Sequence, residues 1–162
     1  MDNQAEQLNS RGYKYLNDKD YVSAYKYFLE AARLGSYNAI YNLGYCNFNG
    51  YGVPKNYDKA MNILSEVAFI ECPIQSNAQY LCGLIMHRKG EDFDKVRVWY
   101  SKAADNGHAW AKFQLGRTYI DENRQLARYY IQEAMKCAPN DYELHSQAKK
   151  LLRLITVVNF LK

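Results

Sequence analysis

The stretch LGYCNFNGYGVPKNYDKA, Leu43–Ala60, decides the fold. Its Gly-Tyr-Gly beside a Pro-Lys has two interpretations: a loop that cradles phosphate, or a connection between two helices. A phosphate loop requires a preceding strand and glycine-spaced amides at the start of a helix. The sequence before these glycines has helical spacing, so we interpret NGYGVPKN as an enlarged turn. Asn56 is then the N-cap of a helix that begins near Tyr57.

The Leu-Gly pair at the start of this stretch belongs to an internal repeat. Comparable glycines are separated by 32, 39 and 33 residues, at Gly12, Gly44, Gly83 and Gly116. After each glycine, a small residue is followed four positions later by a large apolar residue, which is the spacing of one helix face. These second patterns begin at Ala24, Ala60, Val96 and Ala127. A period in the thirties with two helical faces per unit predicts stacked helical hairpins.

We therefore predict an all-α fold, an α/α solenoid of about four helical hairpins plus a C-terminal capping helix, in one domain. The hairpins are expected at residues 3–35, 36–72, 73–107 and 108–138, and the capping helix at 140–161. Each repeat glycine would lie inside the first helix of its hairpin, where glycine costs ~1 kcal/mol relative to alanine. We expect close approach of the second helix at these positions. Gly35 and Gly107 are expected to end second helices.

These residues resemble the Sel-1-like repeat family, which is related to the tetratricopeptide repeat. The second hairpin carries the family pattern at Ala39, Leu43, Gly44, Gly50, Gly52, Val53, Lys59 and Ala60. The third carries it at Ala78, Gly83, Trp99, Tyr100, Lys102, Ala103, Ala104 and Gly107. The resemblance covers about residues 5–138, and the first and fourth hairpins match less well. It implies a solenoid that binds other proteins as a scaffold, adaptor or regulator, and it implies no chemistry.

Charge is distributed unevenly along the chain. The net charge is +4, with −1 on residues 1–81 and +5 on residues 82–162, so a partner with an acidic surface would prefer the C-terminal half. No apolar run approaches the ~20 residues that cross a bilayer. The N-terminal MDNQAEQLNS has no basic segment followed by an apolar run. We expect a cytoplasmic protein without a membrane partner.

The sequence contains no recognisable catalytic or metal-binding motif. Its cysteines lack Cys-x-x-Cys spacing and are expected to be buried free thiols: Cys46, Cys72, Cys82 and Cys137. No serine or cysteine has the sequence context of a nucleophile paired with a base. We therefore predict a protein that is not an enzyme and that needs no cofactor or metal.

A stripe of aromatic and polar residues follows the first helices, which line the concave side in solenoids of the family that this chain resembles. The predicted partner-binding groove consists of Asn9, Tyr13, Tyr41, Tyr45, Phe48, Tyr80, His87, Trp110, Phe113 and Arg117. Two interpretations of its aromatic residues remain open. Residues such as Tyr41, Tyr80 and Phe113 pack between neighbouring hairpins, or the rings form hot spots for an inserted peptide or loop.

The C-terminal helix has more apolar surface than a cap requires. The stripe of Leu144, Ala148, Leu151, Ile155 and Val158 would cover the open end of the fourth hairpin. Beyond this stripe, further apolar residues predict a second contact, with a partner or with another copy of the chain in a homodimer. These residues are Leu154, Val157, Phe160 and Leu161.

Three function classes follow from these observations. The leading one is a non-enzymatic protein-interaction module: a scaffold, an adaptor or an inhibitor, including one of the immunity type. The second is a β-lactam-binding or hydrolysing relative, but such cysteine-rich relatives carry regular cysteine pairs, and here the cysteines occupy unlike positions in their units. The third is an RNA-binding helical repeat, which would need a basic groove. The stripe holds one arginine, one histidine and a glutamate, so nucleic acid is not the expected partner.

Overall fold

The computed structural model describes residues 2–157, and within that range it contains nine α-helices and no strand. The helices are α1 (Asp2–Asn17), α2 (Tyr21–Arg33), α3 (Tyr37–Asn49), α4 (Tyr57–Ala68), α5 (Gln75–Arg88), α6 (Phe93–Asp105), α7 (Ala109–Thr118), α8 (Arg124–Cys137) and α9 (Tyr142–Val157). The predicted all-α fold is confirmed.

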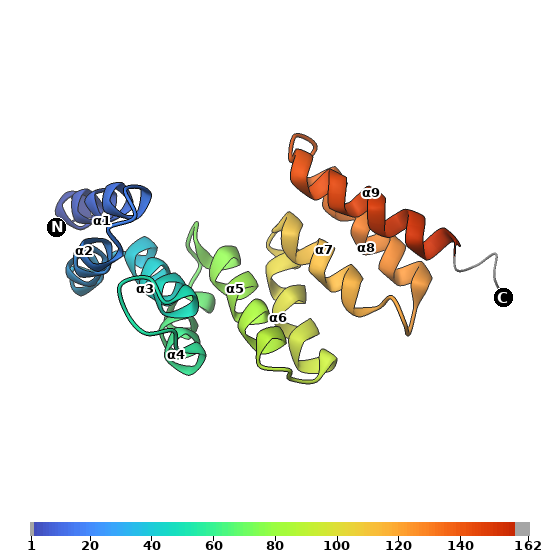
Figure 1. The fold of residues 1–162 in the computed structure, drawn as a ribbon, viewed down its shortest axis with the longest axis horizontal. Helices are drawn as coiled ribbons and strands as arrows, with labels where there is room; N and C mark the ends of the chain where they lie inside the picture. The colour runs from blue at the N-terminus through green and yellow to red at the C-terminus, as the bar shows by residue number, and fades with distance from the viewer. Residues whose placement is uncertain (1, 158–162) are drawn as a thin grey trace.

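The helices pair into four successive hairpins and stack in chain order. Helix α1 packs on α2, α3 on α4, α5 on α6 and α7 on α8, and each second helix also packs on the first helix of the next hairpin. The stack is elongated, with α1 and α9 at opposite ends (Figure 1). Helix α9 packs on α8 and α7 as the predicted cap. The first helices α3 and α5 also contact each other across hairpins, and α7 contacts the cap α9.

The repeat glycines lie where the two helices of a hairpin meet, as predicted. A Cβ atom built on Gly44 would come within 2.5 Å of Leu64 Cγ in α4. The equivalent contacts are Gly12 with Phe28, Gly83 with Tyr100, and Gly116 with Ile131. Because real Cβ atoms do not approach so closely, each large side chain fills the space that a side chain on the glycine would need.

The opening stretch is the connection between α3 and α4. Asn56 Oδ1 accepts a hydrogen bond from the Lys59 amide at 2.8 Å, so Asn56 is the N-cap of α4 as predicted. Gly50 and Gly52 have φ angles of +83° and +70°, in the left-handed region that favours glycine. The interpretation of this segment as a turn between two helices is confirmed.

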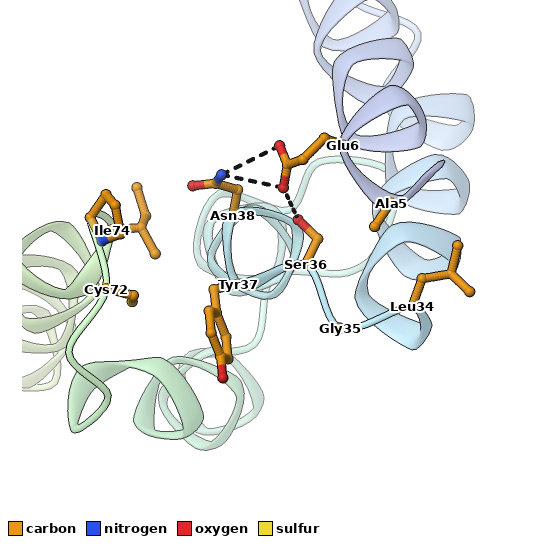
Figure 2. Close-up of a pocket in the computed structure, with 10 residues that line it drawn as sticks. Ala5, Glu6, Leu34, Gly35, Ser36, Tyr37, Asn38, Cys72 and Ile74 are labelled. Carbon is orange, nitrogen blue, oxygen red and sulfur yellow. Dashed lines mark hydrogen bonds between the residues drawn. The ribbon is translucent and has the colours of Figure 1, made fainter. Parts of the chain in front are cut away.

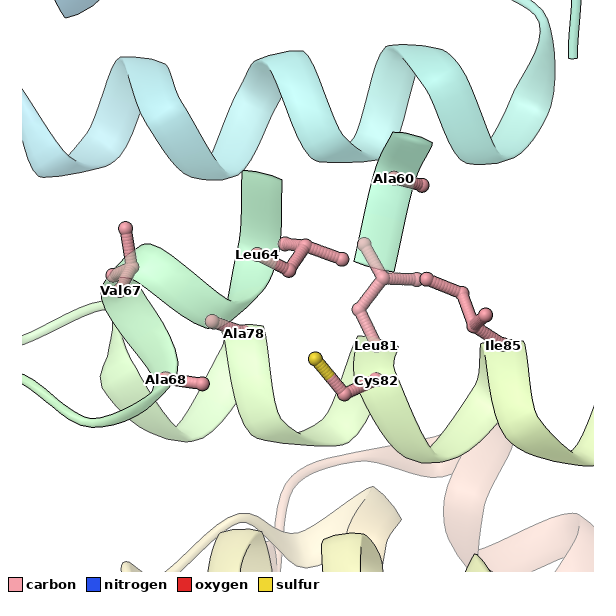
Figure 3. Close-up of a cluster of buried hydrophobic side chains, with 8 residues drawn as sticks. All are labelled: Ala60, Leu64, Val67, Ala68, Ala78, Leu81, Cys82 and Ile85. Carbon is pink, nitrogen blue, oxygen red and sulfur yellow. The ribbon is translucent and has the colours of Figure 1, made fainter. Parts of the chain in front are cut away.

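Buried clusters join one hairpin to the next. Figure 3 shows the cluster between the second and third hairpins, in which Leu64 of α4 lies beside Leu81 of α5, and Val67 and Ile85 belong to the two ends of the same cluster. Alanines on both helices allow the backbones to approach. Burying each large aliphatic side chain contributes about 1.5–3 kcal/mol. A separate cluster of this kind lies at each junction between successive hairpins and between the fourth hairpin and α9, so each hairpin is stabilised by its neighbours.

The cysteines differ from expectation in part. All four cysteines are free thiols. Cys46 and Cys82 are buried as predicted, and Cys72 is half-buried. Cys137 is exposed, so the prediction of a buried thiol is wrong there. Cys137 is the last residue of α8, and the side of the helix on which it lies is not covered. Burial raises the pKa of the Cys46 and Cys82 thiols to about 12, which leaves them protonated and unreactive.

In residues 2–157, no helix is long and apolar enough to cross a membrane.

Candidate functional site

The first helices α1, α3 and α5 bring together tyrosines from three successive hairpins, which we call the tyrosine row: Tyr13, Tyr41, Tyr45 and Tyr80. We call the side of the stack that carries this row the inner face. The rings of Tyr41 and Tyr45 lie 6.4 Å apart, centroid to centroid. Burial, and to a smaller extent the nearby phenols of Tyr13, Tyr45 and Tyr80, raises the pKa of Tyr41 to about 12. Residues predicted on separate helices are thus brought together on one surface.

Residues of α1 hold the first two hairpins together. The Asn42 side-chain amide donates to Asn9 Oδ1 at 2.9 Å, and the Tyr13 hydroxyl donates to Asn42 Oδ1 at 3.0 Å. Asn9 is only 4% exposed, and its hydrogen bond satisfies a buried polar group. Asn9 belongs to the packing between hairpins, so we do not retain it as a contact for a partner. Tyr13 is 40% exposed and remains accessible.

Three predicted residues at the C-terminal end also connect hairpins. The Tyr80 ring stacks on His108 with centroids 4.4 Å apart, and Trp110 Nε1 donates to Asp141 Oδ2 at 2.8 Å. Phe113 is 2% exposed and lies in the core below α8 and α9. Phe113 is therefore a packing residue and is also not retained as a contact, whereas Tyr80 and Trp110 are half-buried.

Tyr45 and Phe48 border the enlarged turn between α3 and α4. The rings of Tyr45 and Tyr51 meet edge to face, with centroids 5.9 Å apart. The centroids of the Phe48 and Tyr57 rings lie 5.5 Å apart. Both predicted residues are half-buried. Tyr51 extends the aromatic surface, and the repeat pattern did not identify it because it lies in the turn and not on a first helix.

A polar hollow lies between α5 and α7, and we call it the α5–α7 hollow. It has a volume of about 280 Å³ and is lined by Leu84, His87, Arg88, Gln114 and Arg117. The structure brings the predicted residues His87 and Arg117 together here. Sequence reasoning missed Arg88, which lies one position beyond the predicted stripe in the last turn of α5. The Arg117 guanidinium donates to Gln114 Oε1 at 2.9 Å.

The pKa of the histidine in this hollow is lowered, which favours its neutral form. Burial lowers the pKa of His87, and the positive charges of Arg117 and Arg88 lower it further. The His87 ring also meets the Phe93 ring edge to face, with centroids 6.0 Å apart. At neutral pH the two guanidinium groups therefore supply the positive charge of the hollow.

A second hollow, of about 250 Å³, lies where the first three hairpins meet (Figure 2). Its polar groups already have partners within the chain. Ser36 Oγ donates to Glu6 Oε1 at 2.8 Å, and the Asn38 amide lies 3.5 Å from both oxygens of the same carboxylate. Cys72 and Ile74 form the opposite wall. We interpret this hollow as a joint between hairpins.

The predicted second contact at the C-terminal helix lies mostly beyond the described part of the chain. Leu154 is 63% exposed on α9. The side chain of Val157 and all of Phe160 and Leu161 lie outside the described residues, as does Val158 of the capping stripe. Leu144, Ala148 and Ile155 of that stripe are buried against the fourth hairpin. Whether this helix forms a homodimer stays a prediction.

The described residues contain no candidate metal site, because no three His, Cys, Asp or Glu side chains among them are placed to hold an ion together. The three histidines lie in different settings: His87 in the hollow, His108 at the start of α7, and His145 against the carbonyls of Met135 and Ala138. The predicted groove residues that stay accessible belong to the tyrosine row, to the border of the turn between α3 and α4, to Trp110 and to the α5–α7 hollow.

The family model described as Sel1 repeat matches four segments of the chain, residues 11–36, 38–66, 76–108 and 111–137. These segments correspond to the four hairpins of the structure. A search of curated protein sequences found no match.

Solved structures with a similar fold include other Sel1 repeat proteins. A Sel1 repeat protein from Oxalobacter formigenes has a TM-score of 0.74 and 24% identity, covering 91% of this chain and 62% of its own. The c5321 protein, a protective antigen present in uropathogenic Escherichia coli strains, has an SLR fold. It matches with a TM-score of 0.73 and 20% identity, and the match covers 91% of this chain and 33% of c5321. MamA has a TM-score of 0.65 and 23% identity, covering 87% and 82%. The chain therefore spans less than two thirds of the first two proteins, and at these identities the likeness shows the fold.

Proposed function

The chain belongs to the Sel1 repeat family, and from this premise we propose that it is a non-enzymatic module that binds a partner protein on the inner face of its first helices. Sel1 repeat proteins generally mediate protein–protein interactions. Such a module acts as a scaffold, an adaptor or an inhibitor, according to what its partner does.

The tyrosine row is the observation that carries this proposal. Tyr13 is 40% exposed, and Tyr41, Tyr45 and Tyr80 are half-buried next to it. A half-buried tyrosine offers a rigid ring and a polar tip, and little side-chain entropy remains to be lost on binding. Residues of this type dominate the energy of protein interfaces. The row continues into the α5–α7 hollow through Leu84, so that apolar and charged contacts adjoin on one face.

Photo-crosslinking tests which face binds. A photoreactive phenylalanine derivative replaces Tyr45 on the inner face in one variant and Tyr129 in another. Tyr129 lies on second helix α8 and is 55% exposed, so it is the matched control. We expect lysate proteins from the native source to crosslink as a discrete band from position 45 and not from position 129. The same band from position 129 alone would contradict the proposal.

Substitution tests the contribution of the ring. We expect Tyr45→Ala to weaken recovery of the crosslinked partner at least about tenfold, because an interface hot spot contributes 2 kcal/mol or more. Tyr129→Ala should recover it as the wild type does. Thermal unfolding of each variant shows that the fold is retained. Equal recovery by all three proteins would remove the tyrosine row from the binding surface.

A further inference from the structure

We propose that the α5–α7 hollow binds a side-chain carboxylate of an acidic segment in the partner protein. This inference rests on the proposed function, because it assumes that the inner face binds, and it adds the chemistry of what is bound there. The hollow brings Arg88 from the last turn of α5 next to Arg117 from α7, with Gln114 and His87 between them.

The two arginines of the hollow are not neutralised by the described part of the chain. Arg117 donates to the neutral amide of Gln114, and neither arginine forms an ion pair with a described carboxylate. Four basic side chains in residues 2–157 do form ion pairs, Lys89 with Asp58, Lys95 with Glu91, Arg97 with Glu122 and Lys136 with Glu133, at 2.6 to 3.0 Å, and the two arginines of the hollow are not among them. The charge of Arg88 and Arg117 is thus available to a ligand.

The helices that line the hollow, α5 and α7, and the neighbouring helix α3 carry no negative charge. No aspartate or glutamate occurs in α3, α5 or α7. The second helices do carry them, for example Glu30 in α2, Asp58 in α4 and Glu133 in α8. Glu6, on α1 at the far end of the stack, is already bonded to Ser36. An acidic segment laid along α5 and α7 would meet attraction without repulsion from these helices.

The chemistry of the hollow favours a carboxylate over a nucleic acid. A guanidinium group presents its N–H donors in a fork that matches two carboxylate oxygens, and the charge-assisted bonds are about twice as strong as neutral ones. Leu84 offers an apolar wall for the methylene groups of a glutamate. A reader of single-stranded RNA would stack bases on aromatic rings. Among the residues that line the hollow, only His87 offers a ring, and it lies beside two arginines whose N–H groups can bind carboxylate oxygens.

NMR titration of the full chain tests this assignment with three probes of equal length: a hexaglutamate peptide, a hexaglutamine peptide and a six-nucleotide single-stranded RNA. We expect hexaglutamate to shift the Nε–Hε resonances of Arg88 and Arg117, and hexaglutamine to leave them unchanged. Because the contact is between exposed charges, raising the salt concentration should weaken it. RNA that binds these arginines more tightly than hexaglutamate would overturn the assignment, as would hexaglutamate that shifts neither.

Two double variants with the same net charge distinguish the effect of the hollow from the effect of the overall charge. The double variant Arg88→Gln with Arg117→Gln removes two positive charges from the hollow. The double variant Arg33→Gln with Arg153→Gln removes two from exposed positions on α2 and α9. We expect the first to bind hexaglutamate at least about tenfold more weakly than the wild type, and the second to bind as the wild type does. Equal weakening in both would overturn the proposal, and unchanged thermal unfolding confirms that the variants are folded.

The partner captured through position 45 distinguishes the two proposals. If Tyr45→Ala loses that partner while Arg88→Gln with Arg117→Gln retains it fully, the inner face binds but the hollow does not. That outcome overturns the carboxylate assignment and leaves the proposed function standing. Loss of the partner in both variants supports both proposals.

Discussion

The backbone of Gly83 in α5 lies directly against the ring of Tyr100 in α6: a Cβ atom at Gly83 would come within 2.5 Å of Tyr100 Cδ1 and Cε1. Glycine inside a helix costs ~1 kcal/mol relative to alanine. The ring that occupies the freed space is completely buried, and burial of a side chain of this size contributes more than the glycine costs. Phe28, Leu64 and Ile131 fill the equivalent space in the other hairpins.

Replacing Gly83 by alanine should therefore destabilise the fold, although alanine is the better helix former. Overpacking costs about 1–3 kcal/mol, which exceeds the propensity gain of ~1 kcal/mol. We expect Gly83→Ala to unfold at a lower urea concentration than the wild type. Ser146→Ala, at an exposed position of α9, is the control and should change little. A Gly83→Ala protein as stable as the wild type would show that Tyr100 can move aside.

Removing the hydroxyl of Tyr100, in contrast, should not destabilise the fold. It is buried and has no hydrogen-bond partner among the described residues. An unsatisfied buried polar group costs about 1–3 kcal/mol. We expect Tyr100→Phe to be at least as stable as the wild type, and Tyr100→Ala to lose about 3–5 kcal/mol because it leaves a cavity. Chemical denaturation measures both. A clear loss in Tyr100→Phe would show that the hydroxyl is hydrogen-bonded in solution.

The sequence predicts most of the fold because its decisive features are local or periodic. The repeat of Gly44 and its equivalents identifies the hairpins, and the polar side chain of Asn56 identifies the start of α4. A one-sided apolar pattern also identifies the capping helix. Each of these features depends on spacing along one helix or between successive hairpins, so that residues near in sequence determine it.

Contacts between distant residues could not be predicted in the same way. Arg97 lies on a second helix, yet it is 9% exposed, pairs with Glu122 at 2.8 Å and donates to the Thr118 carbonyl at the end of α7. Its guanidinium lies 4.1 Å from the centre of the Tyr119 ring. These contacts depend on where α7 ends and how the next turn folds back. No period in the sequence determines either feature.

In the candidate site, too, helical spacing predicts some features, and contacts between distant residues determine the others. The face on which Tyr41, Tyr80 and Phe113 lie follows from helical spacing. How far each is buried depends on the neighbouring hairpin, so Phe113 proved to be inside the core. Arg88 joins the hollow although it lies one position off the stripe, because its long side chain reaches across. The absence of acidic residues from the first helices of the second, third and fourth hairpins would have pointed to this hollow.

Acid should weaken the fold through His108, which is the N-cap of α7 and accepts a hydrogen bond from the Ala111 amide at 3.1 Å. Burial lowers the pKa of His108 to about 4, below ~6.5 in an unfolded chain. Between these values the unfolded chain binds the proton more readily than the folded one. The stabilisation is therefore complete above pH ~6.5 and is lost as the pH falls towards 4, by an amount on the order of 3 kcal/mol.

A variant that cannot titrate isolates this effect. His108→Asn keeps a side-chain acceptor at the N-cap but removes the imidazole. We expect the free energy of unfolding of the wild type to decrease more steeply than that of the variant as the pH is lowered from 6.5 to 4. Urea denaturation at a series of pH values measures both slopes. Parallel pH profiles would show that His108 titrates normally in the folded protein.

Two glycines with the same backbone conformation should respond differently to alanine, because only one lies against another part of the chain. Gly52 and Gly90 have φ angles of +70° and +74°. A Cβ on Gly90 would meet nothing within 4 Å, whereas a Cβ on Gly52 would overlap the carbonyl oxygen of Tyr21. The adjacent Tyr51 ring is stacked on the Tyr21 ring, with centroids 4.2 Å apart.

We expect Gly90→Ala to cost about 1–2 kcal/mol, the price of a left-handed conformation for a residue with a side chain. Gly52→Ala should cost at least ~1 kcal/mol more, since the turn must move away from the start of α2 and the stacking of Tyr51 on Tyr21 is lost as well. Urea unfolding of the two variants beside the wild type gives the comparison. Because the conformational cost is common to both, the difference between them reports the contact alone. Equal losses would mean that the turn between α3 and α4 does not rest on the first hairpin in solution.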